Sequence, residues 1–139
     1  MKLSFEKFKY AVGEVIAFCQ MIEHDLKVIY STLIYGDFDE NYQSLKTTTL
    51  GTMINYIEEN DLETNLNYFS KSDYRLLKDL TRRRNYVCHE IFLTFVYKKD
   101  FINSNEYLLA CESLLTFHSE IVEISKKIEQ RRIYIKKQG

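Results

Sequence analysis

The chain has 139 residues, of which 45% are hydrophobic and 14% aromatic, so it is long enough for one folded core and short for two. It contains no proline and only 4 glycines, which argues against β-sandwiches and barrels because these folds need turn residues at short intervals. The 19 Lys and Arg residues against 20 Asp and Glu residues give a net charge of −1, which excludes a globally basic nucleic-acid binder. We therefore expect helices, and any contact with nucleic acid must come from a local basic patch.

Three cysteines, Cys19, Cys88 and Cys111, share no CxxC spacing. They predict small buried thiols in a reducing compartment, and neither a disulfide framework nor a zinc site. Charged residues interrupt the N-terminal segment, so we expect no signal peptide, and no stretch approaches the roughly 18 apolar residues of a membrane span. The chain is therefore expected to be cytoplasmic, with no membrane partner.

The first predicted element is a long amphipathic helix over about 3–34, where apolar residues recur at alternating steps of three and four. Gly36 is expected to end this helix, and the polar segment 37–48 is expected to be a loop. A second helix is predicted over about 50–60, with Thr49 as its N-terminal cap.

A third helix is predicted in the middle of the chain, after a connection over 61–68 whose structure the sequence leaves open. Ser70 and Asp73 have the spacing of a capping box and mark the start of this helix. The continuous apolar run 92–97 has strand propensity, but a lone strand would have no partner in this chain. We therefore interpret the run as the end of the third helix and a packed connection.

A fourth helix is predicted after Asn103 and Glu106, which again have the spacing of a capping box, and it continues to about Ile135. No internal repeat, low-complexity segment or linker interrupts residues 1–139. The sequence therefore predicts an all-α fold in a single domain, an up-and-down bundle of four or five helices.

One segment differs from ordinary bundle sequence: residues 82–92, which read Arg-Arg-Arg-Asn-Tyr-Val-Cys-His-Glu-Ile-Phe. Three consecutive like charges repel one another on a helix, so stability alone does not explain them. Arg84 and His89 are separated by four residues, Asn85 follows the Arg, and apolar residues follow the His. This segment resembles the signature of the HEPN family, an Arg and a His separated by four to six residues. The short, proline-free helical chain agrees with the bundle of that family.

The resemblance implies a metal-independent endoribonuclease of the toxin or defence type, which cleaves RNA by attack of the RNA's own 2′-OH. His89 would transfer the proton, because imidazole titrates near neutral pH, and Arg84 would stabilise the charge of the phosphorane. Asn85 would position these groups, and Arg82 and Arg83 would hold RNA. The expected products end in a 2′,3′-cyclic phosphate and a 5′-hydroxyl.

The resemblance also implies partners beyond RNA. Arg84 and His89 lie roughly 140° apart around an ideal helix, so a straight helix does not place them on one face. A distorted helix, the long Arg84 side chain, a contribution from Arg82 or a homodimer would each bring the groups together. A toxin needs restraint in its own cell, which makes an antitoxin protein a further expected partner. Ile91 stands where some family members carry a Tyr that such antitoxins modify, so control through that Tyr is not implied.

Two alternatives stay open. The first alternative to a nuclease is a non-catalytic module of the same fold that binds RNA, a nucleotide or a protein. The second is a purely structural dimerising bundle. His24 and His118 lie in or beside apolar stripes and are predicted to be structural, and the basic run 126–137 either follows a phosphate backbone or places cations at the end of a helix. We expect no metal and no cofactor, because the scattered His and Cys residues form no ligand set and no glycine-rich loop is present.

Overall fold

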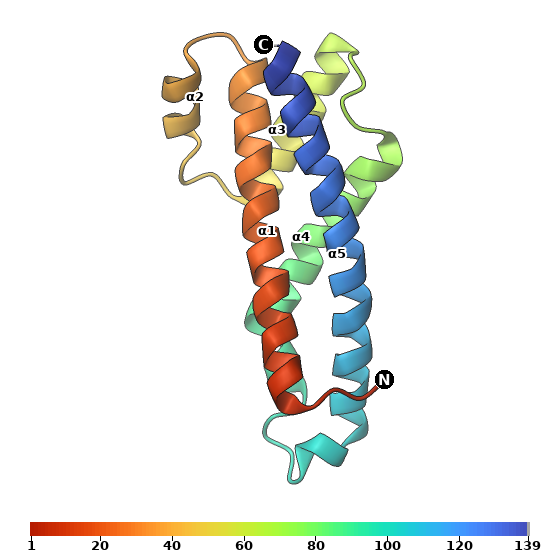
Figure 1. The fold of residues 1–139 in the computed structure, drawn as a ribbon. Helices are drawn as coiled ribbons and strands as arrows, with labels where there is room; N and C mark the ends of the chain where they lie inside the picture. Colours follow the sequence, from red (N-terminus) through yellow and green to blue (C-terminus); the bar gives the residue numbers. More distant parts are fainter. Residues whose placement is uncertain (139) are drawn as a thin grey trace.

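A computed structural model describes residues 1–138, and every regular element in this part of the chain is helical (Figure 1). The elements are α1 (Phe5–Leu33), α2 (Phe38–Ser44), α3 (Leu50–Thr64), α4 (Lys71–His89) and α5 (Asn105–Gln138), with two short 3-10 helices, Ile91–Thr94 and Phe101–Asn103, between α4 and α5. The predicted all-α bundle is thereby confirmed. No helix within 1–138 is both long enough and apolar enough to cross a membrane.

Helices α1 and α5 lie side by side and point the same way, while α4 runs in the opposite direction along them (Figure 1). Their facing sides are apolar, and α1 alone buries Phe8, Val15, Ile22 and Ile29 at less than 1% exposure. Residues spaced by seven lie on one side of a helix, so this burial follows directly from the helical periodicity of the sequence.

An aromatic cluster fixes the connection between α4 and α5 against the start of α1. Phe95 lies at its centre, with its ring centroid 4.9 Å from that of Tyr107 and 5.3 Å from that of Phe8. The Tyr107 hydroxyl donates a hydrogen bond of 2.7 Å to the Leu3 carbonyl, which satisfies a buried polar group. The run 92–97 is thus a packed connection without a strand, as the sequence predicts. The prediction that the third helix extends into this run is wrong, because α4 ends at His89 and a separate 3-10 helix follows.

Two capping predictions are confirmed. The Thr49 hydroxyl accepts from the Thr52 amide at 3.3 Å at the start of α3. Ser70 and Asp73 form both hydrogen bonds of a capping box, each of 3.1 Å, at the start of α4. Such side-chain oxygens satisfy amides that have no partner within the helix.

Two local predictions are wrong. The segment 37–48 is not wholly a loop, because the Asp37 carboxylate accepts from the Glu40 amide at 3.1 Å and caps the short helix α2. The start of α5 is capped by Ser104, whose hydroxyl accepts from the Tyr107 amide at 3.1 Å. Asn103 lies in the preceding 3-10 helix and bonds Asp100 instead. Ser104 is the next residue after Asn103 and is also a good capping residue, so the sequence does not distinguish the two positions.

Candidate functional site

Helix α4 carries all five residues of the predicted site, Arg82, Arg83, Arg84, Asn85 and His89. Leu77, Leu80 and Val87 are buried along one side of it and hold it against the bundle. The helix ends at His89, after which the chain turns into the first 3-10 helix. The consecutive residues of the motif therefore face different surroundings, because each step along a helix turns by about 100°.

Arg82 and Arg83 make different contacts. Arg82 is exposed, and its guanidinium lies 2.6 Å from the Asp79 carboxylate one turn earlier. Arg83 pairs with Glu120 of α5, and its guanidinium carbon lies 4.4 Å from the centre of the Phe117 ring. Arg83 therefore joins α4 to α5, whereas Arg82 faces solvent. Contact of either residue with RNA stays a prediction.

Arg84 lies on the side of α4 that faces α1. Its Nε is buried and has no hydrogen-bond partner among the described residues. Its charge acts on the Cys19 thiol of α1 and partly opposes the effect of burial, which raises the pKa of Cys19 to about 12. An unsatisfied buried donor costs about 1–3 kcal/mol, so the bundle does not explain the presence of a guanidinium at this position.

Asn85 and His89 are both exposed, one turn apart on the outer side of α4. Neither side chain makes a hydrogen bond or an ion pair with any residue in the described range 1–138. Arg82, Asn85 and His89 share this face because they are separated by three and four residues. The structure thus brings three of the predicted site residues together, and places Arg84 on another side of the helix.

The other histidines have structural partners. The His24 Nδ1 lies 2.9 Å from the Tyr42 hydroxyl and joins α1 to α2. The His118 Nε2 lies 3.3 Å from the Glu14 carboxylate, between α5 and α1. These contacts agree with the structural role predicted for both residues. No group of three His, Cys, Asp or Glu side chains suited to a metal ion occurs among the described residues.

The prediction of three buried thiols is wrong for Cys88. Cys19 and Cys111 are buried, but Cys88 is exposed on α4, immediately before His89. The residue type alone does not distinguish the three thiols, because their burial depends on which neighbouring elements cover each one in the fold.

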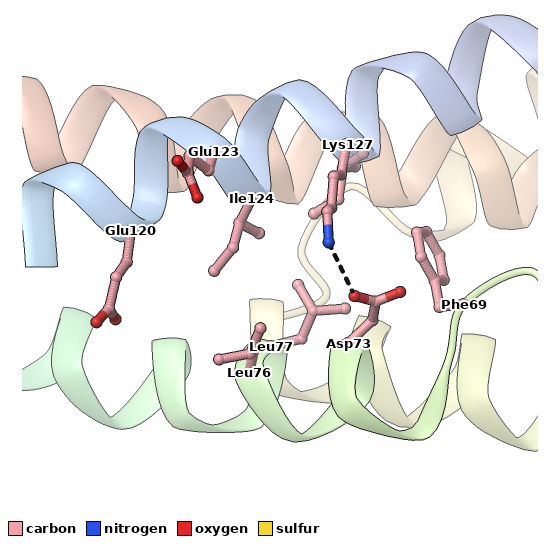
Figure 2. Close-up of a pocket in the computed structure, with 9 residues that line it drawn as sticks. Phe69, Asp73, Leu76, Leu77, Glu120, Glu123, Ile124 and Lys127 are labelled. Atoms are coloured by element: carbon pink, nitrogen blue, oxygen red, sulfur yellow. Dashed lines mark ion pairs between the residues drawn. The ribbon is translucent and has the colours of Figure 1, made fainter.

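A narrow pocket lies between α4 and α5, lined by Leu76, Leu77 and Ile124, with an ion pair of 3.6 Å between Lys127 and Asp73 at one end (Figure 2). Its volume of about 100 Å³ is well below the 300–1,000 Å³ of typical ligand sites. We therefore assign the pocket to imperfect packing of the two helices.

A larger hollow lies beyond this pocket, where the connection between α3 and α4 meets α5. Its volume is about 650 Å³, and Lys71, Asn67 and Arg131 are among the residues that line it. Two smaller hollows adjoin it, and both have Arg131 and Tyr134 in their walls. The sequence analysis missed this feature, because residues 60 positions apart form it. Only the basic run 126–137 pointed toward it.

Comparisons of the chain with protein-family models, with curated proteins and with solved structures found no match. The assignment of function therefore depends on the residues and their geometry.

Proposed function

We propose that the protein is a metal-independent endoribonuclease whose site forms between two copies of the chain. The observation that carries the proposal is the position of His89. It is exposed beside Asn85 and Arg82, and its imidazole makes no contact with a described residue that would occupy it. A histidine in this position is free to exchange protons with a substrate, whereas His24 and His118 are engaged in the bundle.

The reaction needs only groups that the chain and RNA supply. The 2′-OH of RNA attacks the adjacent phosphorus while His89 takes its proton, and His89 then gives this proton to the departing 5′-oxygen. The phosphorane carries additional negative charge, which a guanidinium stabilises with two parallel N–H donors. Loss of the 5′-oxygen leaves a 2′,3′-cyclic phosphate and a 5′-hydroxyl. Arg84 is the guanidinium in this scheme, and Asn85 positions the phosphate or the imidazole.

A homodimer resolves the separation of Arg84 and His89. In a twofold pair, the His89 of each copy meets the Arg84 of the other copy, so that each of the two sites takes one residue from each chain. Arg84 as a whole is only half-buried, so part of its guanidinium remains available to a phosphate at the interface.

A non-catalytic RNA-binding module is the second candidate. It is favoured by the observation that a single chain places Arg82, Asn85 and His89 on one exposed face, and Arg84 elsewhere. Such a surface holds a phosphate backbone without aligning a guanidinium on the reacting phosphorus.

The deciding experiment incubates the purified protein with mixed cellular RNA in EDTA between about pH 6 and 8. We expect cleavage by the wild type and by the matched control His24→Gln, with 2′,3′-cyclic phosphate ends, and none by His89→Ala or Arg84→Ala. Binding of RNA by the wild type without cleavage at any pH would support the binding module. Equal cleavage by all four proteins would indicate a contaminating nuclease and contradict the proposal.

A further inference from the structure

The outer face of α4 carries a stripe of basic residues that begins at the N-terminus of the helix and ends at the proposed site. Its members are exposed and lie three or four residues apart, so they share one side of the helix: Lys71, Arg75, Lys78, Arg82 and His89, with Asn85 between the last two. From the first to the last, the stripe extends over about 27 Å at the helical rise per residue. We call this set the α4 stripe.

Part of the α4 stripe has no acidic partner. Lys78 pairs with Glu58 at 2.7 Å, and Arg82 pairs with Asp79 at 2.6 Å. Lys71 and Arg75 make no ion pair with any residue in 1–138. Exposed pairs such as the first two contribute little energy, about 0–1 kcal/mol each, so a phosphate competes with the carboxylates at modest cost.

The hollow around Arg131 lies at the N-terminal end of the α4 stripe, and Lys71 belongs to both. Three carboxylates also line the hollow. Glu58 pairs with Lys78 and Asp73 pairs with Lys127, whereas Asp61 accepts from the Tyr74 hydroxyl at 2.7 Å, which leaves its charge in place. Arg131 is exposed and, like Lys71, makes no ion pair within the described residues, so both are unengaged charges in the wall of this hollow.

Tyr134 adds an aromatic surface beside this charge. It is 56% exposed, and it lines two hollows together with Arg131, unlike the exposed tyrosines Tyr10, Tyr35 and Tyr97. An exposed ring next to a free guanidinium is the combination that binds an unpaired base and its phosphate. Tyr134 lines the two adjoining hollows, of about 500 and 410 Å³, and Arg131 lines these as well as the larger one of about 650 Å³, so the three together have room for one nucleotide.

We propose that single-stranded RNA lies along the α4 stripe, from His89 to the hollow, where one nucleotide places its phosphate on Arg131 and Lys71 and extends its base into the adjoining hollows against Tyr134. This inference rests on the proposed function for cleavage at His89, and it extends that function by naming the substrate class and the path of the strand. Helical turns repeat every 5.4 Å or so, which is close to the spacing of successive phosphates in an extended strand. A duplex keeps its bases paired and offers none to Tyr134.

The test measures binding of a labelled RNA of about 12 nucleotides by fluorescence anisotropy, with His89→Ala as the parent protein so that the RNA stays intact. The test variant adds Lys71→Gln, Arg75→Gln and Arg131→Gln. The matched control adds Lys7→Gln, Lys9→Gln and Lys46→Gln, which remove the same charge from exposed positions outside the stripe, the hollow and the basic run 126–137.

We expect the test variant to bind single-stranded RNA at least about tenfold more weakly than the parent, and the control to stay within about twofold. The slope of log K against log salt concentration should fall by about 2 in the test variant, because each phosphate contact contributes about 0.7. Tyr134→Ala should weaken binding without changing this slope, whereas Tyr134→Phe should bind like the parent because it keeps the ring.

If RNA binding weakens equally in the test variant and the control, the proposed strand path is wrong. Tighter binding of a duplex than of the single strand would also overturn it, as would competition by polyglutamate as effective as that by unlabelled RNA, which would indicate an acidic protein as the partner. The underlying nuclease proposal fails separately. If the wild type never cleaves RNA but its binding depends on the stripe, the nuclease proposal is wrong and the strand path is supported. If the wild type cleaves and the stripe substitutions leave the rate unchanged at limiting RNA, the strand path is wrong and the nuclease proposal is supported.

Discussion

Arg84 and His89 lie on different sides of α4. Arg84 faces α1, where its Nε is buried and without a hydrogen-bond partner, and His89 is exposed as the last residue of the helix. Helix α4 continues without interruption between them, so their five-residue separation turns the two side chains roughly 140° apart. A single chain therefore does not aim both side chains at one phosphate, and the composite site has a direct test.

Mixing two inactive variants should restore activity. In a dimer of Arg84→Ala with His89→Ala, one of the two composite sites loses both residues and the other keeps both. Random exchange makes half of the dimers mixed, so about a quarter of the wild-type cleavage should return. The measurement is the rate of RNA cleavage after the two purified proteins are mixed in equal amounts.

The control for this prediction is each variant mixed with itself, which should stay inactive. A site within one chain would give no recovery in the mixture. A light-scattering mass of a monomer at tens of micromolar would contradict the dimer independently.

Replacing Arg84 should separate its role in function from any role in stability. Arg84→Met keeps the unbranched stem and removes the unsatisfied Nε, so we expect the free energy of unfolding to change by less than about 1 kcal/mol while cleavage is lost. Arg83→Met is the matched comparison, and it should destabilise by about 1 kcal/mol more because it loses Glu120 and the Phe117 ring. Denaturant unfolding measures both. A larger loss of unfolding free energy for Arg84→Met than for Arg83→Met would show that Arg84 serves to stabilise the fold.

Most of the fold could be predicted from the sequence, because helical periodicity and capping are local signals. The steps of three and four that bury Phe8, Val15 and Ile22 are visible in the sequence, and so is the capping box of Ser70 and Asp73. The helix α2 was missed because its stability depends on contacts with α1, such as the hydrogen bond from Asn41 Nδ2 to the Ser31 carbonyl at 3.2 Å. Such contacts join residues that no local pattern relates.

The candidate site could be predicted only in part, for the same reason. Spacing alone places Arg82, Asn85 and His89 on one face, and the structure agrees. The commitment of Arg83 to α5 depends on Glu120, 37 residues away, which the arginine run does not indicate. The hollow around Arg131 likewise requires α5 to lie beside the connection between α3 and α4.

Acid should weaken the start of α4 through Asp73. Although burial alone would raise the pKa of Asp73, hydrogen bonds from Ser70 and the charge of Lys127 lower it below the ordinary value of 3.8. A carboxylate with a lowered pKa stabilises the fold fully above that ordinary value, and this contribution is lost as the pH falls through the lowered pKa. We expect the melting temperature to drop more steeply below about pH 4 in the wild type than in Asp73→Asn, which lacks this titration. Parallel profiles of the two proteins would contradict this role.

The three thiols should differ sharply in reactivity, and one of them should report on the site. Cys88 is exposed, whereas Cys19 and Cys111 are buried, and burial raises the pKa of Cys19 to about 12. Thiolate is the reacting form, so a disulfide reagent at pH 8 should modify one thiol rapidly in the folded protein and three in denaturant. Cys88→Ser should abolish the rapid reaction.

Modification of Cys88 by a bulky maleimide should also reduce cleavage, because this residue immediately precedes His89 on α4. The control is the Cys88→Ser protein treated with the same reagent, which should keep its activity because its remaining thiols are buried. Unchanged cleavage by the fully modified wild type would mean that RNA and a second copy both avoid this part of α4. That result would contradict the placement of the site at His89, since a bulky group on the adjacent residue would obstruct either one.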